Sequence, residues 1–130
     1  MNIVSTHHIA LYTPNYPEMR RFYTETLGLP VVGGFQGHNI IFLAAGSTTI
    51  ELEETSAGAH GTVGWAHLAF EVADIAAACA ELAAQGVTFH IPPQDFPALA
   101  PAVRSAFFKD PDGNELELLQ PLGSRYPAPA

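Results

Sequence analysis

The stretch that decides the fold is Trp65-Ala66-His67-Leu68-Ala69-Phe70-Glu71-Val72, because its pattern occurs twice in the chain. The other copy, His8-Ile9-Ala10-Leu11-Tyr12, lies near the N-terminus. Each copy is an alternating run led by histidine, and a turn signal, a helical pattern and a glycine follow it. Three pairs of landmarks keep nearly one offset: His8 and His67 are 59 residues apart (67 − 8), Asn15 and Asp74 are 59 apart (74 − 15), and Gly28 and Gly86 are 58 apart (86 − 28). A constant offset predicts a duplicated structural unit.

Both halves show the order β-α-β-β-β. In the first half we expect strands at residues 8–12, 31–32, 39–44 and 48–53, with a helix from Pro17 to Leu27. In the second half we expect strands at 65–72, 87–91, 103–109 and 114–120, a helix capped by Asp74, a loop at 92–101 and a tight turn at 110–113. The sequence therefore predicts one domain over residues 1–122, with repeats at 5–55 and 64–121 and a loose C-terminal tail at 123–130.

Composition narrows the classes of partner. The chain has 130 residues, of which 48% are hydrophobic and 14% charged, as in a compact globular domain. A net charge of −8 argues against nucleic acids and anionic membranes, which bind through lysine and arginine. The absence of a signal segment or spanning apolar run predicts a cytoplasmic protein. Cys79, the sole cysteine, excludes an intrachain disulfide and a thiolate metal cluster.

The alternation of the strands places four polar residues on one face. Ile9, Leu11, Ile50, Leu52, Leu68, Phe70, Val72, Leu116 and Leu118 share the phase expected to pack on the helices. His8, Glu51, His67 and Glu117 fall on the opposite face. Imidazole and carboxylate ligands suit a divalent ion such as nickel, cobalt, zinc, manganese or iron, so these four residues are the candidate metal ligands.

Several ordered segments resemble the vicinal oxygen chelate superfamily, which includes glyoxalase I, bleomycin and fosfomycin resistance proteins, extradiol dioxygenases and methylmalonyl-CoA epimerase. The segments that carry the resemblance are His8-Ile9-Ala10-Leu11, Phe22-Tyr23, Leu27-Gly28, Thr49-Ile50-Glu51-Leu52, His67 to Val72, and Asp110 to Leu118. The resemblance implies an α+β fold in which two βαβββ repeats form a curved mixed sheet around a metal site. His8, Glu51, His67 and Glu117 match the metal ligands of bacterial glyoxalase I.

The chemistry implied by the resemblance is proton transfer at a carbon next to a carbonyl. Two substrate oxygens chelate the metal, and a ligand carboxylate removes the proton to give an enediolate. Glu117 is the first candidate for the base and Glu51 the second. Glutathione-dependent members carry an arginine and an asparagine that bind glutathione, where this chain has Tyr12 and the stretch Glu53-Glu54-Thr55-Ser56. A glyoxalase I-like lyase or isomerase that is poorly suited to glutathione is therefore the leading hypothesis.

Three alternatives stay open: a methylmalonyl-CoA epimerase-like enzyme, an extradiol dioxygenase-like enzyme, and a non-catalytic antibiotic-binding resistance module. In each case we expect the partner to be a small molecule.

We also expect a homodimer, because repeats with free strand edges must pair with another copy within or between chains.

Other polar and aromatic residues carry weaker expectations. His7 is expected to be an exposed neighbour of His8, and His38, His60 and His90 to be surface residues. Outer-shell roles are conceivable for Glu53, Glu71 and Glu115, and Phe35, Trp65 and Phe108 are either pocket-lining or core residues.

Overall fold

The computed structural model describes residues 1–26, 28–56, 64–109, 113 and 115–129. The chain forms two compact units. We call His8–Ala66 with Tyr126–Ala130 the N-terminal unit, and Met1–His7 with His67–Arg125 the C-terminal unit. Each unit thus combines a continuous stretch of the sequence with a segment from one end of the chain.

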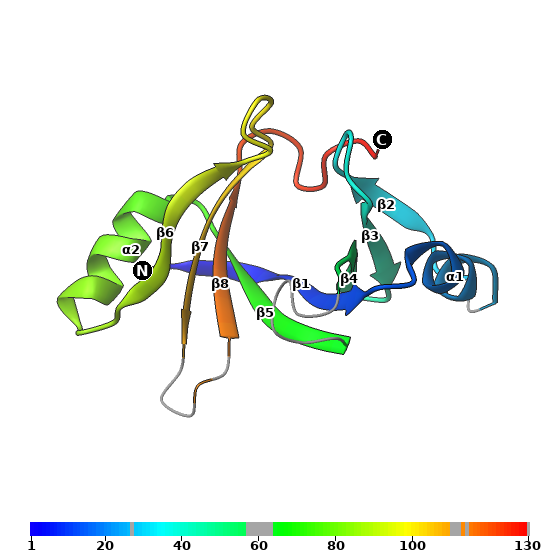
Figure 1. The fold of residues 1–130 in the computed structure, drawn as a ribbon. Coiled ribbons are helices and arrows are strands. Elements are labelled where there is room, and N and C mark those ends of the chain that lie inside the picture. The colour runs from blue at the N-terminus through cyan, green and yellow to red at the C-terminus, as the bar shows by residue number, and fades with distance from the viewer. Residues whose placement is uncertain (27, 57–63, 110–112, 114, 130) are drawn as a thin grey trace. The chain divides into compact units, whose positions relative to one another are not determined.

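The N-terminal unit contains the first βαβββ repeat (Figure 1). Its elements are β1 (Ile3–Thr13, which belongs to this unit from His8 onward), α1 (Tyr16–Arg21), the π-helical turn η1 (Phe22–Thr26), β2 (Val31–Gly34), β3 (Ile40–Ala45) and β4 (Thr48–Glu54). The strands lie in the order β2-β3-β4-β1, with β1 parallel to β4 and the other neighbours antiparallel. Pro17 lies in the first turn of α1, where its missing N–H leaves no bond unmade.

The C-terminal unit contains the second repeat. Its elements are β5 (Gly64–Val72), α2 (Ile75–Ala84), β6 (Phe89–Phe96), β7 (Val103–Lys109) and β8 (Glu115–Pro121). The strands lie in the order β5-β8-β7-β6, with β5 parallel to β8 and the others antiparallel. Asp74 caps α2, since its carboxylate accepts a hydrogen bond of 3.1 Å from the Ala77 N–H. The predicted α+β fold of two βαβββ repeats with mixed strand pairing is confirmed.

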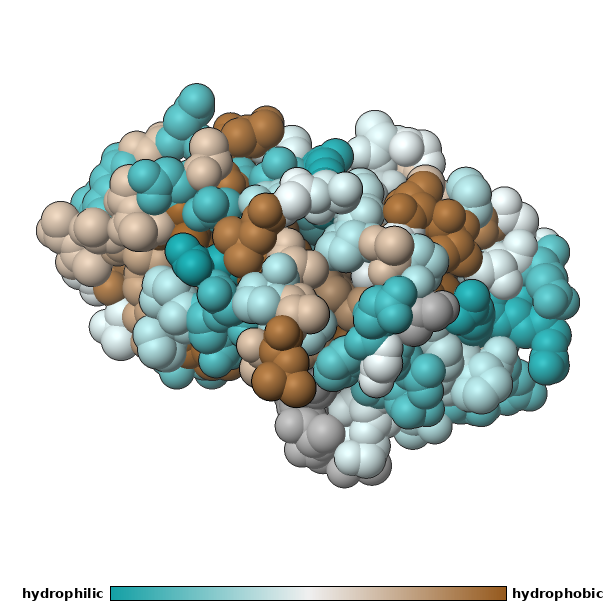
Figure 2. Space-filling view, turned by 90° about the horizontal axis from the view of Figure 1, so that it is seen from above, coloured by the Kyte–Doolittle hydropathy of each residue, from teal (hydrophilic) through white to brown (hydrophobic). Residues whose placement is uncertain are grey.

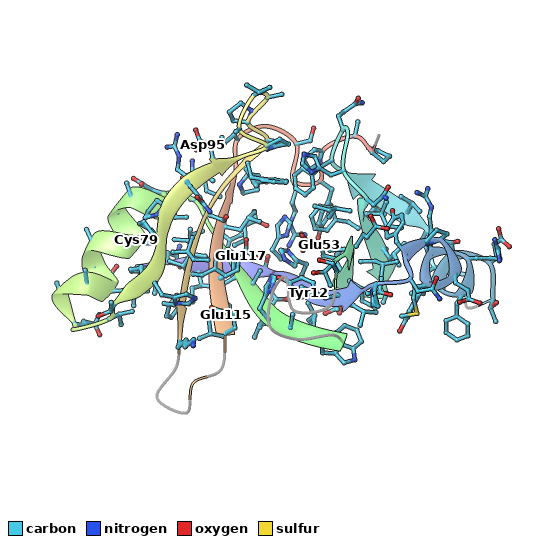
Figure 3. All side chains as sticks on the ribbon, viewed as in Figure 1. Tyr12, Glu53, Cys79, Asp95, Glu115 and Glu117 are labelled. Atoms are coloured by element: carbon cyan, nitrogen blue, oxygen red, sulfur yellow. The ribbon has the colours of Figure 1, made fainter. Side chains whose placement is uncertain are left out.

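Each unit has its own hydrophobic core on the helical side of its strands. The core of the N-terminal unit comprises Leu11, Tyr16, Ile41, Leu43 and Leu52, and that of the C-terminal unit Val72, Ile75, Ala78, Cys79, Ala106 and Leu118. Register explains this sorting: Leu11 pairs with Leu52, while Ala10 and Glu51 pair on the other face. Burial among these apolar groups raises the pKa of the Cys79 thiol on α2 (Figure 3).

The predicted boundary of β6 is wrong. We expected a strand at 87–91 and a loop at 92–101, but the strand runs from Phe89 to Phe96 and includes Pro92 and Pro93. β6 is the last strand in its order, and its register with β7 shifts between Ile91 and Gln94. An irregular edge strand tolerates proline because the missing N–H is not needed by a second neighbour. Most of the expected turn at 110–113 and most of the connection at 54–64 lie outside the described residues.

The surface shows apolar residues in separate patches among hydrophilic ones (Figure 2). Exposed large apolar side chains include Val4, Trp65 and Leu99. Single exposed apolar residues are common on proteins and do not by themselves indicate a partner. Among the described residues, no helix has the length and apolar character needed to cross a membrane.

Candidate metal centre

The first histidine–glutamate pair lies in the N-terminal unit. His8 comes from β1 and Glu51 from β4, and their exposed fractions are 1% and 8%. Ala10 is the register partner of Glu51, so His8, two residues before Ala10, shares the face of Glu51. The His8 Nε2 and Glu51 Oε2 atoms are 3.6 Å apart. Two neighbouring parallel strands therefore present an imidazole and a carboxylate together.

The second pair repeats this arrangement in the C-terminal unit. His67 comes from β5 and Glu117 from β8, where Figure 3 shows Glu117 on its strand. The two residues are 8% and 5% exposed, and Ala69 is the register partner of Glu117. The His67 Nε2 and Glu117 Oε1 atoms are 3.0 Å apart. The repeated sequence thus places the same pair of side chains, a histidine beside a glutamate, in each unit.

A phenylalanine lies beside each histidine, and the sequence analysis did not single out either one. The ring of Phe42 meets His8 edge-on at 5.5 Å, and Phe107 meets His67 edge-on at 5.3 Å. Phe42 is the register partner of Glu51, and Phe107 is that of Glu117. Each glutamate thus has a cross-strand phenylalanine that packs against its histidine and restricts the orientation of the ring. The signal in the sequence was their similar distance before the glutamates, nine residues (51 − 42) and ten (117 − 107).

The separations within the pairs fit neighbouring ligands of one ion. Ligand nitrogen and oxygen atoms lie about 2.0–2.2 Å from zinc, so neighbouring ligands at octahedral or tetrahedral angles are about 3.0–3.5 Å apart. The measured 3.0 and 3.6 Å lie close to this range. A direct hydrogen bond also fits the 3.0 Å pair, but 3.6 Å between His8 Nε2 and Glu51 Oε2 exceeds the usual hydrogen-bond length.

Burial strengthens the case for a cation. An ionised carboxylate that loses water must be compensated by hydrogen bonds or by positive charge. Glu51 and Glu117 are both buried, and each has an imidazole nitrogen as a neighbour. His8, His67 and Glu117 each offer a buried atom of a type that binds metals. Each pair therefore offers buried donor atoms of the kinds that a divalent ion binds.

The expectation that His7 is exposed is wrong. The side chain of His7 is buried, with 1% of its surface exposed, and its Nε2 atom lies 3.0 Å from the backbone oxygen of Arg125. Arg125 also donates hydrogen bonds to Glu71 at 2.5 Å, to Ser5 at 2.8 Å and to the carbonyl oxygen of Thr6 at 2.9 Å. The segment that follows β8 covers His7, and a contact between residues 118 positions apart leaves no local sequence signal.

The other acidic candidates have partners of their own. Glu71 binds Arg125, and Glu115 on β8 lies 2.8 Å from the Nε2 atom of His90 (Figure 3). Glu53 is the register partner of Tyr12. His38 and His90 are exposed, as expected, and His90 lies beside a carboxylate. His60 lies in the part of the chain that is not described.

The three aromatic residues that the sequence singled out differ in burial. Phe108 packs against the core of the C-terminal unit, and Trp65 is exposed. Phe35 is buried, and its ring lies 5.6 Å from that of Phe42. Phe35 therefore supports the phenylalanine beside His8, while Phe108 is a core residue.

Comparison with known proteins assigns the family. Residues 5–118 match the Glyoxalase/Bleomycin resistance protein/Dioxygenase superfamily. Because the match spans most of the sequence, the chain belongs to this superfamily, and the resemblance found in the sequence is confirmed. No curated protein matches the sequence.

Solved structures agree on the fold. A methylmalonyl-CoA epimerase from Mycobacterium tuberculosis is 22% identical, with a TM-score of 0.75 over 92% of this chain and 89% of that one. A Streptomyces coelicolor methylmalonyl-CoA epimerase bound to 2-nitronate-propionyl-CoA is 22% identical, with a TM-score of 0.76 over 97% and 100%. A hypothetical protein from Bacillus halodurans C-125 is also 22% identical, with a TM-score of 0.74 over 92% and 95%. At this identity the likeness shows the fold alone.

Proposed function

We propose that this protein is a metal-dependent lyase or isomerase that moves a proton at a carbon next to a carbonyl. The observation that carries the proposal is the buried histidine–glutamate pair found in both units. A sequestering module needs a binding surface but has no evident need for two buried carboxylates beside imidazoles. The membership of the superfamily supports this chemistry without naming the substrate.

The ligand set in this proposal combines both repeats. His8, Glu51, His67 and Glu117 would hold one divalent ion, which would polarise a substrate carbonyl and stabilise the enediolate that forms on loss of the proton. Two carboxylates neutralise the charge of the ion, and the phenylalanine beside each imidazole limits its rotation. The apolar rings also keep water from the ligands, which strengthens electrostatic interactions.

A glutamate of the same set serves as the base. Glu117 is the first candidate and Glu51 the second, and both carboxylates are buried. A positioned carboxylate typically contributes about 10²–10⁴ to the rate of a proton transfer. In a glyoxalase-type reaction the carboxylate that takes the proton returns it to the neighbouring carbon. In an epimerase-type reaction the other carboxylate of the set would deliver a proton to the opposite face of the same carbon.

The substrate in this proposal is not a glutathione conjugate. Tyr12 and Thr55 stand where glutathione-dependent relatives carry anchoring side chains, and both are buried. Glu53 lies opposite Tyr12 in the register and adds negative charge. An anionic tripeptide should therefore bind poorly. Several similar structures are methylmalonyl-CoA epimerases, so a 2-methyl-branched thioester is a second candidate substrate.

Solvent proton exchange tests the proposal. Protein loaded in turn with nickel, cobalt, zinc and manganese is incubated in deuterated water with hemithioacetals of several thiols and with 2-methyl-branched thioesters. We expect deuterium in at least one substrate and slow turnover of the glutathione hemithioacetal. Glu117→Gln should abolish exchange, and metal content measured in the same sample separates loss of the base from loss of the ion. His90→Ala, which alters an exposed histidine, should exchange at the parent rate.

Absence of exchange into every substrate, with metal bound, would refute the proton-transfer chemistry. Oxygen uptake with catechols would instead favour a dioxygenase.

A further inference from the structure

The end of the chain packs on the sheet of the N-terminal unit. The N–H of Gly34 on β2 donates a hydrogen bond of 2.8 Å to the carbonyl oxygen of Pro127. Figure 1 shows the chain end beside β2 and β3. A segment expected to be loose therefore has specific contacts, and these involve the outermost strand of the unit.

Tyr126 makes the most extensive of these contacts. Its ring lies 5.2 Å from that of Phe42, tilted by 49°. Its hydroxyl group lies 2.7 Å from the Oγ1 atom of Thr49, a buried residue on β4. A packed ring and a fixed hydroxyl hold the half-buried side chain of Tyr126 in one orientation.

The face that Tyr126 covers is the one that carries His8 and Glu51. Phe42 is the register partner of Glu51, so both side chains point to the same side of the sheet. Thr49 lies two residues before Glu51 on β4 and shares that side. Because the Phe42 ring touches both His8 and Tyr126, only one aromatic ring separates Tyr126 from the candidate ligand.

Gly33 provides the space for this arrangement. A Cβ atom at Gly33 would lie 2.6 Å from the Tyr126 Cβ and 2.8 Å from the Pro127 oxygen. The three atoms nearest to a Cβ at Gly33 belong to Tyr126 and Pro127, and the backbone of Gly33 is not in the left-handed region. Alanine at this position would therefore disturb the docked segment rather than the sheet. Gly34 is less specific, because a Cβ there would also meet the Ile40 oxygen at 2.8 Å.

We propose that Tyr126 is a specificity-determining residue that forms a wall beside His8 and Glu51 and limits the size of the group a chelating ligand can place there. The inference rests on the proposed metal site. The wall consists of aromatic rings, and the tyrosine hydroxyl is engaged by Thr49, so the group that fits beside it is compact and apolar. Such a group would lie next to the chelating oxygens of the substrate.

Hydroxamates of graded size test the inference, because they chelate divalent ions through two neighbouring oxygens. The affinities of acetohydroxamate and 2-naphthohydroxamate for the cobalt-loaded full-length protein are measured by calorimetry. Tyr126→Ala should raise the affinity for the naphthyl compound, relative to the acetyl compound, by about tenfold or more, since filling a pocket with extra carbon atoms changes affinity on this scale. Tyr126→Phe keeps the ring and should keep the parental ratio.

A glycine pair supplies an independent test. Gly33→Ala should displace the segment and shift the ratio in the same direction as Tyr126→Ala. Gly123→Ala is the matched control, because no atom of the described residues lies within 4 Å of a Cβ there. Amide exchange at Gly34, whose N–H is bonded to Pro127, should become faster in Gly33→Ala and stay unchanged in the control.

The outcomes separate the two proposals. An unchanged ratio in Tyr126→Ala and Gly33→Ala, with cobalt bound as in the parent protein, would overturn the role of Tyr126 and leave the metal site standing. Failure of the parent protein to bind any divalent ion would overturn both.

Discussion

Removal of one histidine ligand should weaken metal binding while the fold persists. His67→Ala takes away an imidazole whose Nε2 atom lies 3.0 Å from Glu117 Oε1. Loss of groups that merely support metal ligands costs about 10–100-fold in affinity, so loss of a ligand should cost at least about 100-fold. Calorimetric titration with cobalt measures the change. His90→Ala removes a histidine beside Glu115 and should bind as the parent does; equal losses in both variants would contradict the assignment.

At the scale of single residues, the repeat and the alternation of the strands predicted which polar side chains share a face of the sheet. His8, Glu51, His67 and Glu117 were predicted from the repeat, the strand phase and the family resemblance, and in each unit the pair lies together and buried. Their joint role as metal ligands stays a prediction. Burial of His7 and the docking of Tyr126 could not be predicted, because both depend on contacts with residues far away in the sequence.

At the scale of elements, the cap of α2 gives a measurable prediction. Asp74→Ala removes the carboxylate that accepts from the Ala77 N–H at 3.1 Å. The free energy of unfolding should fall by about 1 kcal/mol, the typical cost of losing such a cap. Urea denaturation followed by circular dichroism measures it. Asp74→Asn retains a capping oxygen and should lose much less, so equal losses in the two variants would show that the cap itself is not responsible.

Neighbouring leucines on β8 test the phase of the strand. Leu118 is 1% exposed in the core of the C-terminal unit, whereas Leu116 is half-buried. Leu118→Ala should cost about 2–5 kcal/mol of unfolding free energy, because it leaves a cavity in a packed core. Leu116→Ala should cost clearly less. If denaturant titration showed the reverse order, the assigned facing of β8 would be wrong.

The elements themselves were predictable wherever the periodicity was regular. The order of the strands along the chain and the positions of the two helices follow from alternation and helical spacing, and the turn between β3 and β4 follows from Gly46. The first helix is shorter than the three turns expected from Pro17 to Leu27, because α1 ends at Arg21 and the π-helical turn η1 follows it. β6 was misjudged because prolines normally indicate a loop, and only its edge position lets them remain in a strand. The strand β1 begins at Ile3 rather than at the expected His8, and only apolar residues in the sequence indicated this extension.

At the scale of the whole molecule, we predict a homodimer. β6 ends the strand order of the C-terminal unit, and an exposed strand edge tends to be covered by another element or another chain. Light scattering at micromolar concentration should give about twice the chain mass of 13.9 kDa. A monomer under these conditions would contradict this prediction without affecting the assignment of the ligands.

The constant offset in the sequence predicted the two repeats. It did not predict that each end of the chain packs with the opposite repeat. Residues 1–7 belong with the second repeat and 126–130 with the first. Neither segment lies within the sequence pattern that repeats, so periodicity says nothing about where they dock.

Metal stoichiometry of the purified chain tests the central claim most directly. Protein prepared without added metal is stripped with a chelator, dialysed against nickel, cobalt, zinc or manganese, and analysed for metal by elemental analysis. The two buried histidine–glutamate pairs predict about one ion per chain for at least one of these metals. They also predict loss of that ion in Glu51→Gln and in Glu117→Gln, because each substitution removes a ligand carboxylate from one of the two units. A folded protein that binds none of these ions, or whose bound ion survives both substitutions, would contradict the account.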